Sequence, residues 1–208
     1  MISRRVLLLF FTVSFFHNVP AANSGEEQFD ILFSWLDSFT SLSGGFRQTQ
    51  SRAYDGVSAE STGDFKALKP DYFSWHQITP DDQLVLSDAE FIWHYDKDLE
   101  TVTRRKISDQ MASLQLLLGD STSIKNGYSI FSRNIGDYHL TPRNPHSNFQ
   151  VIRLYFTKHE LSQIEIIDRI GHELIIELSD LQYNPSLTAE DFVINASENA
   201  EFLYDGNF

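Results

Sequence analysis

Residues 63–105 hold the feature that most limits how this chain can fold, a run of short apolar segments separated by turn-forming residues. The segments are rich in aromatic and β-branched side chains. The breaks between them fall at Pro70, Thr79-Pro80-Asp81, Ser87-Asp88 and Asp96-Lys97-Asp98. This spacing predicts a meander of antiparallel strands joined by short turns. Such a sheet has a large aromatic face, which must lie against a core, a partner or a ligand.

An amphipathic helix is predicted before this meander, over residues 26–42. Apolar side chains recur there every three or four positions, and Glu26 and Glu27 would lie in the first turn, where the helix dipole favours negative charge. The apolar set is Phe29, Leu32, Phe33, Leu36 and Phe39. We expect Gly44-Gly45 to end the helix and residues 46–52 to form a strand.

A second, short helix is predicted over residues 109–118, capped by Ser108, with Leu114, Leu117 and Leu118 on one side. Further apolar segments predict strands at 61–68, 128–132, 138–141, 149–156, 161–168 and 173–179, with one or two short strands near Phe192 and Phe202. The fold class is therefore α+β, with about nine to eleven antiparallel strands and helices on one side of the sheet. A sheet of this size has to curl or close.

The N-terminus predicts a cleaved signal peptide over residues 1–21. Arg4 and Arg5 precede an apolar run that is too short to span a bilayer comfortably, and small residues follow at Ala21 and Ala22. The alternative, a membrane anchor, needs about 20 apolar residues. Residues 22–208 would then be one exported domain, with the net charge falling from −13 to −15 because the removed segment carries Arg4 and Arg5 and no acid. Such a charge disfavours nucleic acid as a partner.

Motifs for catalysis or metal binding are missing from the sequence. There is no cysteine, and the histidines show neither HxxxH nor HExxH spacing. No nucleophile elbow, P-loop or dinucleotide fingerprint occurs either. We therefore expect neither an enzyme nor a cofactor. The positive signal is the aromatic content of 13%, with 17 phenylalanines, which fits either an ordinary sheet core or an apolar cavity between sheet and helices.

The order of these segments resembles the periplasmic outer-membrane lipoprotein carrier family, LolA. The likeness covers nearly the whole predicted mature chain and is densest over residues 63–105. The segments that carry it are Phe46-Arg47-Gln48-Thr49-Gln50, Lys69-Pro70, Phe73-Ser74-Trp75, Gln83-Leu84-Val85-Leu86-Ser87-Asp88, Trp93-His94-Tyr95-Asp96 and Leu140-Thr141-Pro142.

This resemblance implies an incomplete antiparallel β-barrel, closed by helices that act as a lid over a hydrophobic cavity. A monomeric carrier would take up the acyl chains of lipoproteins released by an inner-membrane ABC transporter complex. It would then deliver them to an outer-membrane lipoprotein receptor, without a cofactor of its own.

The predicted site has three parts. Alternate residues of a strand point to opposite faces of the sheet, and we take the face with the heaviest side chains to be the inner one. We therefore expect the cavity to be lined by Phe73, Trp75, Leu84, Leu86, Trp93 and Tyr95. We expect the lid to contribute Phe33, Leu36, Leu114, Leu117 and Leu118. Lys69 stands where the family commonly has an arginine that reaches the lid, so it is the predicted lid latch.

Two alternatives of related fold remain to be weighed. The outer-membrane receptor is itself a lipoprotein, and this sequence has no cysteine to acylate. A regulatory or scaffold module that senses lipoproteins in the periplasm without transporting them is the other alternative. A further departure from the family lies at Asp88-Ala89, where Asp-Gly is frequent. Because alanine resists positive φ, we expect a turn wider than two residues there.

Overall fold

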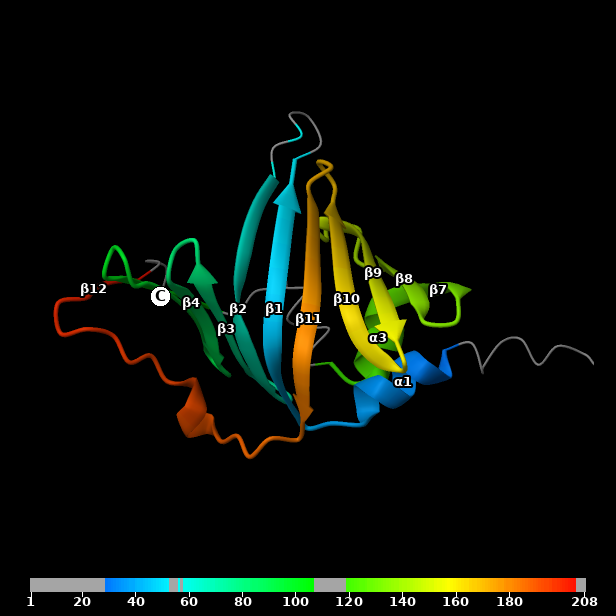
Figure 1. Ribbon diagram of the computed structural model, residues 1–208, viewed down its shortest axis with the longest axis horizontal. Helices are drawn as coiled ribbons and strands as arrows, with labels where there is room; N and C mark the ends of the chain where they lie inside the picture. The colour runs from blue at the N-terminus through cyan, green and yellow to red at the C-terminus, as the bar shows by residue number, and fades with distance from the viewer. Residues whose placement is uncertain (1–28, 53–55, 57, 107–118, 205–208) are drawn as a thin grey trace, which may run out of the picture.

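The strands of the computed structural model form a single curved sheet (Figure 1). The structure describes residues 29–52, 56, 58–106 and 119–204. The twelve strands run in the order β12-β6-β5-β4-β3-β2-β1-β11-β10-β9-β8-β7, one more strand than the upper end of the expected range. Neighbours pair antiparallel except β12, which runs parallel to β6. The α+β class with one large antiparallel sheet is thus confirmed.

The predicted meander is present. Its strands are β2 (Ser58–Leu68), β3 (Tyr72–Thr79), β4 (Gln83–Asp88), β5 (Phe91–Asp96) and β6 (Thr101–Lys106). The second half of the chain forms an equivalent series of hairpins, β7 (Tyr128–Asn134), β8 (Asp137–Pro142), β9 (Phe149–Thr157), β10 (Glu160–Asp168) and β11 (Glu173–Tyr183). The two halves are joined by β1 (Ser41–Ser51), which pairs with β2 on one side and β11 on the other.

The helices lie against the inner face of the curved sheet, beside its second half (Figure 1). They are α1 (Asp30–Asp37) and α3 (Ser121–Gly127). Leu32, Trp35 and Leu36 of α1 are buried, as is Ile124 of α3. These side chains join one hydrophobic core with inward residues of β1–β3 and β7–β11, among them Phe65, Tyr138, Leu140, Ile152 and Leu154.

Gly44 and Gly45 lie inside β1, so the expectation that they end the first helix is wrong. The helix ends earlier, at Asp37. The register between β1 and β11 shifts between Ser43 and Gly45, and the strands approach closely there. A Cβ on Gly44 would lie 2.8 Å from both the Ser179 carbonyl oxygen and a methyl carbon of Leu181. The glycine is therefore a requirement of strand contact and not a helix terminator.

Other local expectations differ at the helices and the C-terminus. Helix α3 was not predicted, and the predicted helix 109–118 lies outside the described residues. The segment around Phe192 is a 3₁₀ turn, η1 (Ala189–Phe192), instead of a strand, whereas β12 (Glu201–Tyr204) matches the strand expected near Phe202. Neither α1 nor α3 nor η1 has the length and apolar character of a membrane-spanning helix.

The β4–β5 turn is tighter than expected. Only Ala89 and Glu90 separate the two strands, and Ala89 takes a φ of 75°. The Asp88 side chain accepts hydrogen bonds from the backbone N–H groups of Glu90 (3.0 Å) and Phe91 (2.8 Å). These bonds hold the two-residue turn in place despite the cost of positive φ for alanine.

Candidate functional site

The most aromatic part of the inner face surrounds Trp75 on β3. Its indole stacks on the Phe46 ring, with centroids 3.7 Å apart and planes 23° apart. Phe65 and Phe73 lie nearly parallel to it, with centroids at 5.9 and 6.0 Å. The three phenylalanines are buried and Trp75 is half-buried, so the indole is the accessible member of this aromatic group.

The six predicted cavity residues do not share a face, and this part of the prediction is wrong. Residues paired directly across an antiparallel ladder point to the same side. Trp75 pairs with Val85, whereas Ser74 pairs with Leu86 and His76 with Leu84. Phe73 and Trp75 therefore point inward. The other four residues point outward together, because the β4–β5 register pairs Leu84 with Tyr95 and Leu86 with Trp93.

The outward group is covered by the C-terminal segment. Leu86, Tyr95, Val102 and Phe192 are buried but lie outside the main core. Phe192 of η1 contacts the Tyr72 ring, with centroids 5.5 Å apart. The Tyr95 hydroxyl accepts a hydrogen bond from the backbone N–H of Ser197 (3.2 Å). A second, smaller core thus forms on the outer face. The assumption that the heaviest side chains face inward missed it, because the segment that covers it comes from a distant part of the chain.

Lys69 joins the sheet to the C-terminal end of α1. Its ammonium group donates a hydrogen bond to the Leu36 carbonyl oxygen and lies 3.9 Å from the centroid of the Phe39 ring. Its backbone N–H donates to the Thr40 carbonyl oxygen (2.8 Å). A cation beside the last carbonyls of a helix is also favoured by the helix dipole. The predicted latch residue therefore contacts α1, the helix that carries Phe33 and Leu36.

Acidic side chains from both helices surround the Lys69 ammonium. Burial lowers the pKa of Lys69, and the negative charges of Asp37 and Asp120 oppose this by raising it. Asp37 also accepts a hydrogen bond from the backbone N–H of Ser121 at the start of α3 (2.9 Å). Asp120 caps the same helix by accepting from the Ser123 N–H (2.7 Å). Lys69 thus lies where the ends of α1 and α3 meet.

The other predicted lid residues are placed as follows. Leu36 is fully buried in the core, and Phe33 packs at its edge under the ammonium of Lys125, 4.0 Å from the ring centroid. Leu114, Leu117 and Leu118 lie outside the described residues. Lid function for any of these residues stays a prediction.

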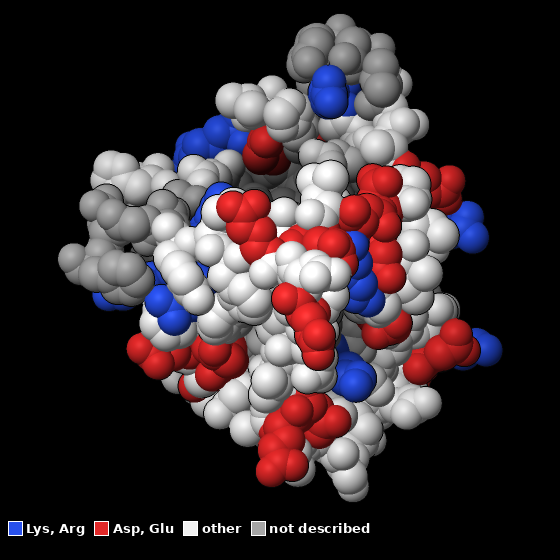
Figure 2. Space-filling view, turned by 90° about the vertical axis from the view of Figure 1, so that its left-hand side faces the viewer, with Lys and Arg blue, Asp and Glu red and all other residues white. Residues whose placement is uncertain are grey.

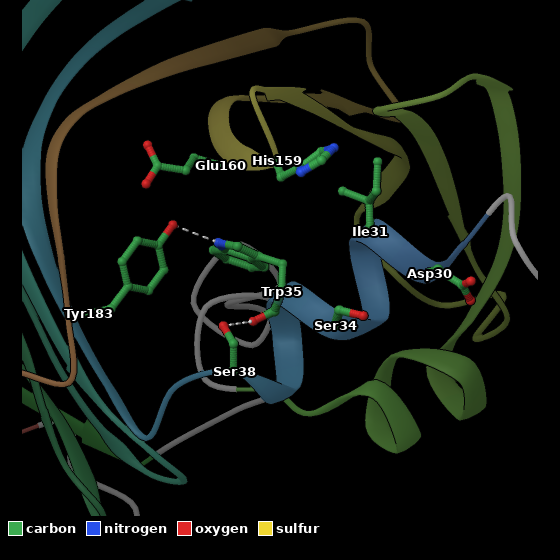
Figure 3. Close-up of a pocket in the computed structure, with 8 residues that line it drawn as sticks. All are labelled: Asp30, Ile31, Ser34, Trp35, Ser38, His159, Glu160 and Tyr183. Atoms are coloured by element: carbon green, nitrogen blue, oxygen red, sulfur yellow. Dashed lines mark hydrogen bonds between the residues drawn. The ribbon is translucent and has the colours of Figure 1, made fainter.

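A pocket of about 520 Å³, which no sequence pattern had indicated, lies between α1 and the β9–β10 hairpin (Figure 3). Ile31 and Trp35 line it from α1, Tyr183 from β11, and His159 and Glu160 from the hairpin. The Trp35 indole N–H donates to the Tyr183 hydroxyl across 3.0 Å. Recognising this pocket from sequence would have required knowing that residues 148 positions apart meet.

Acidic side chains dominate the face of the molecule at the β12 edge of the sheet (Figure 2). The meander contributes strongly to this charge, since residues 71–100 carry eight acids and one lysine. Within the part of the chain that the structure describes, no three His, Cys, Asp or Glu side chains form a group that could hold a metal ion.

The comparisons agree on one family. The family model described as "Outer membrane lipoprotein carrier protein LolA" matches residues 37–195. An outer-membrane lipoprotein carrier protein from Azotobacter vinelandii is 28% identical over 206 residues, covering 97% of this chain and 98% of the relative. The corresponding protein from Pseudomonas syringae pv. tomato is 26% identical over 207 residues, covering 97% and 100%.

Among solved structures, an uncharacterized conserved protein from Thermus thermophilus superposes with a TM-score of 0.50 at 13% identity. The match covers 86% of this chain and 97% of that protein. At this identity the likeness concerns the fold alone.

Proposed function

Because the chain belongs to the LolA family of outer membrane lipoprotein carrier proteins, we propose that it carries lipoproteins by enclosing their acyl chains between the inner face of the sheet and the helices. The observation that supports this most is the aromatic group around Trp75, which presents a half-buried indole on the inner face, stacked on buried phenylalanine rings. Phe46, Phe65, Phe73 and Trp75 form the floor of the proposed acyl site.

The energetics of the cargo require such a site. An acyl chain of about fifteen methylenes costs roughly 12 kcal/mol to expose to water, at about 0.8 kcal/mol per CH₂. A carrier in water therefore has to offer a dry apolar surface and has to be able to uncover it. Leu32, Trp35 and Leu36 of α1 pack into the core on the inner face, so the proposal has α1 move away from the sheet during uptake.

Lys69 is the proposed latch of that movement. Its hydrogen bond to the Leu36 carbonyl oxygen and its attraction to Asp37 and Asp120 hold the ends of α1 and α3 against the sheet. Cargo can shift the balance toward the open state only by its differential affinity for that state. Lysine lacks the planar fork of arginine, so this latch holds a helix end by one charged group.

The proposed carrier is exported and works in the periplasm with two membrane partners. Residues 1–21 act as a signal peptide, and the mature chain works in the periplasm as a monomer that performs no chemical step. It receives acylated lipoproteins from an inner-membrane ABC transporter complex and hands them to an outer-membrane receptor. The alternative of a sensing or scaffold module is not favoured, because the full-length relatives are named as carriers.

The two tryptophans of the meander give a direct test, since they lie on opposite faces of the same sheet. Of the three tryptophans in the chain, Trp75 points inward and Trp93 outward. One double variant, Trp35→Phe with Trp93→Phe, keeps only Trp75, and the other, Trp35→Phe with Trp75→Phe, keeps only Trp93. Each is loaded with a lipopeptide whose acyl chains are brominated, because bromine quenches tryptophan fluorescence on contact.

We expect strong quenching of Trp75 and little quenching of Trp93, because only the inward indole contacts the acyl chains. The same lipopeptide without bromine controls for changes caused by binding alone. Equal quenching of both residues, or stronger quenching of Trp93, would contradict an acyl site on the inner face.

A further inference from the structure

The pocket between α1 and the β9–β10 hairpin is distinct from the proposed acyl site. Its α1 wall is a stripe of residues four apart, in which Trp35 follows Ile31 and Ser34 follows Asp30. Trp35 is also part of the core with Leu32 and Leu36, so its ring borders both the core and the pocket, while Asp30 and Ser34 are on the exposed side of the helix. At about 520 Å³ the pocket falls within the usual range for ligand sites, about 300–1,000 Å³.

The opposite wall is held by a tight turn. Lys158 and His159 have φ values of 53° and 69°, and Glu160 pairs with Thr157, which is the arrangement of a two-residue hairpin turn. This turn fixes the position of Glu160 over the aromatic floor. Figure 3 shows Glu160 and His159 on one side of the space, with Trp35 and Tyr183 below them.

The floor of the pocket presents rings more than free polar atoms. The Trp35 N–H donates to the Tyr183 hydroxyl, so the indole already has its hydrogen-bond partner within the protein. Burial raises the pKa of Tyr183; the hydrogen bond from Trp35 opposes this rise, and the nearby Glu160 carboxylate adds to it. Tyr183 therefore stays neutral at physiological pH, and Glu160 supplies negative charge beside it.

The charge of the lining selects the ligand. Among the residues that the structure describes, Asp30 and Glu160 are the acidic residues of the lining, and neither lysine nor arginine contributes to it. An anionic headgroup would be repelled, and a plain hydrocarbon would make no use of the two carboxylates, which are exposed at the pocket. A lysine or arginine side chain suits both the aromatic floor and the acidic wall, because its methylenes can lie on the rings while its charge approaches Glu160.

We propose that this pocket binds a basic segment of the cargo's polypeptide while the acyl chains occupy the inner face of the sheet. The inference rests on the proposed carrier function, which places a tethered polypeptide beside the lid. A segment bound there contacts α1, whose end is held by Lys69, so the polypeptide and the acyl chains act on the same helix.

The test uses two probes without acyl chains, so that it is independent of the acyl site. They are acetylated, amidated hexapeptides that alternate Lys with Phe or Glu with Phe. Binding to the ¹⁵N-labelled mature chain is followed by NMR at the Trp35 indole N–H and the backbone of residues 158–160. We expect saturable shifts at these positions with the lysine peptide, weakening as salt is raised, and none with the glutamate peptide.

Two variants locate the site. Glu160→Lys should weaken binding of the lysine peptide by about tenfold or more, because an attraction becomes a repulsion. Ser34→Phe should block the pocket by filling it from the exposed side of α1. Glu198→Lys, the same charge change on the exposed C-terminal segment, should leave binding unchanged.

Equal binding of both peptides, or undiminished binding of the lysine peptide to Glu160→Lys, would overturn the proposal. The acyl site is assayed separately with Trp75→Glu, which places an unpaired charge on the proposed acyl floor. If this variant loses lipopeptide uptake but keeps the hexapeptide shifts, the two sites are independent. Loss of quenching in the tryptophan experiment would remove the carrier function while leaving the peptide result readable.

Discussion

Single side chains decide how tightly the turns of the meander are held, and Asp88 is the clearest case. Besides the Glu90 and Phe91 N–H groups, its carboxylate accepts the indole N–H of Trp93 (2.7 Å). Burial alone would raise the pKa of Asp88, but these hydrogen bonds outweigh it and lower the pKa below the usual value. The carboxylate thus supports both a turn with Ala89 at positive φ and the outward position of Trp93.

The lowered pKa of Asp88 has a defined consequence for stability. A carboxyl whose folded pKa lies below its unfolded value stabilises the protein above the unfolded pKa, and this stabilisation is lost as pH falls through the folded pKa. We expect Asp88→Asn to lower the free energy of unfolding at pH 7 by about 1 kcal/mol or more. The deficit should shrink below about pH 4, where aspartate becomes protonated.

Urea unfolding of both proteins between pH 7 and pH 3 measures this difference. Asp81→Asn is the matched control in the preceding turn, because the described side-chain hydrogen bonds do not include the Asp81 carboxylate. A deficit that stays constant across this range would show that the charge of Asp88 is not what stabilises the turn.

At the scale of the elements, sequence patterns predicted strands better than they predicted faces. The turn residues of the meander placed β3 to β6 correctly because short-range chemistry determines such turns. The parity of β3 was also recoverable, since Phe73 and Trp75 both reach the inner face. The parity of β4 and β5 was not, because the heavier apolar side chains of these strands lie on the outer face, where Phe192, a distant residue, helps to cover them.

The glycines of β1 and helix α3 show two further limits. A glycine pair after an apolar helix resembles a helix end, and only the contact with β11 reveals why Gly44 lies in a strand. Helix α3 has a single buried apolar residue, Ile124, so it lacks the periodicity by which helices are recognised. The pocket beneath the β9–β10 hairpin likewise depends on tertiary contacts.

The pairing of α1 with Lys69 leads to a prediction for transfer. A hydrogen bond from a charged donor is worth about 1.5–3 kcal/mol, which changes the open fraction by about one to two decades. Lys69→Leu should therefore favour the open lid, strengthen retention of lipopeptide and slow its transfer to the receptor more than its uptake. Lys69→Arg should transfer at least as well as the wild type, because arginine keeps the charge and adds donors.

Transfer of a labelled lipopeptide from loaded carrier to purified receptor provides the measurement. Lys66 lies on β2, which ends directly before Lys69. Lys66→Leu therefore serves as the control for the loss of one positive charge. Transfer by Lys69→Leu at the wild-type rate would mean that Lys69 does not act as a latch.

For the whole molecule, the main electrostatic feature is the acidic surface at the β12 edge (Figure 2). With a net charge of −13 for the full sequence, the protein is repelled by anionic lipid headgroups. A carrier in the proposed periplasmic setting would benefit from this repulsion, since its proposed apolar cargo site would otherwise favour adsorption to a membrane.

We expect the mature protein to co-sediment only weakly with phosphatidylglycerol vesicles at low salt. Replacing the exposed acids Asp71, Asp81 and Glu90 by lysine should increase co-sedimentation, by about 1 kcal/mol for each lysine near the surface, and added salt should reverse the gain. Vesicles of phosphatidylcholine control for apolar adsorption. Strong wild-type binding to the anionic vesicles would contradict a protective role of the surface charge.

The central position of β1 also sets the order in which the chain can assemble. β1 is the first strand in the sequence, yet one of its two partners is β11, and Trp35 meets Tyr183 across 148 positions. Until residue 183 has emerged from the ribosome, one edge of β1 stays unpaired and the core stays open. Because such long-range pairing is slow, a nascent chain remains unfolded for most of its synthesis. For the export proposed above, the same pairing of β1 with β11 would keep the precursor in the extended state that a secretion channel requires.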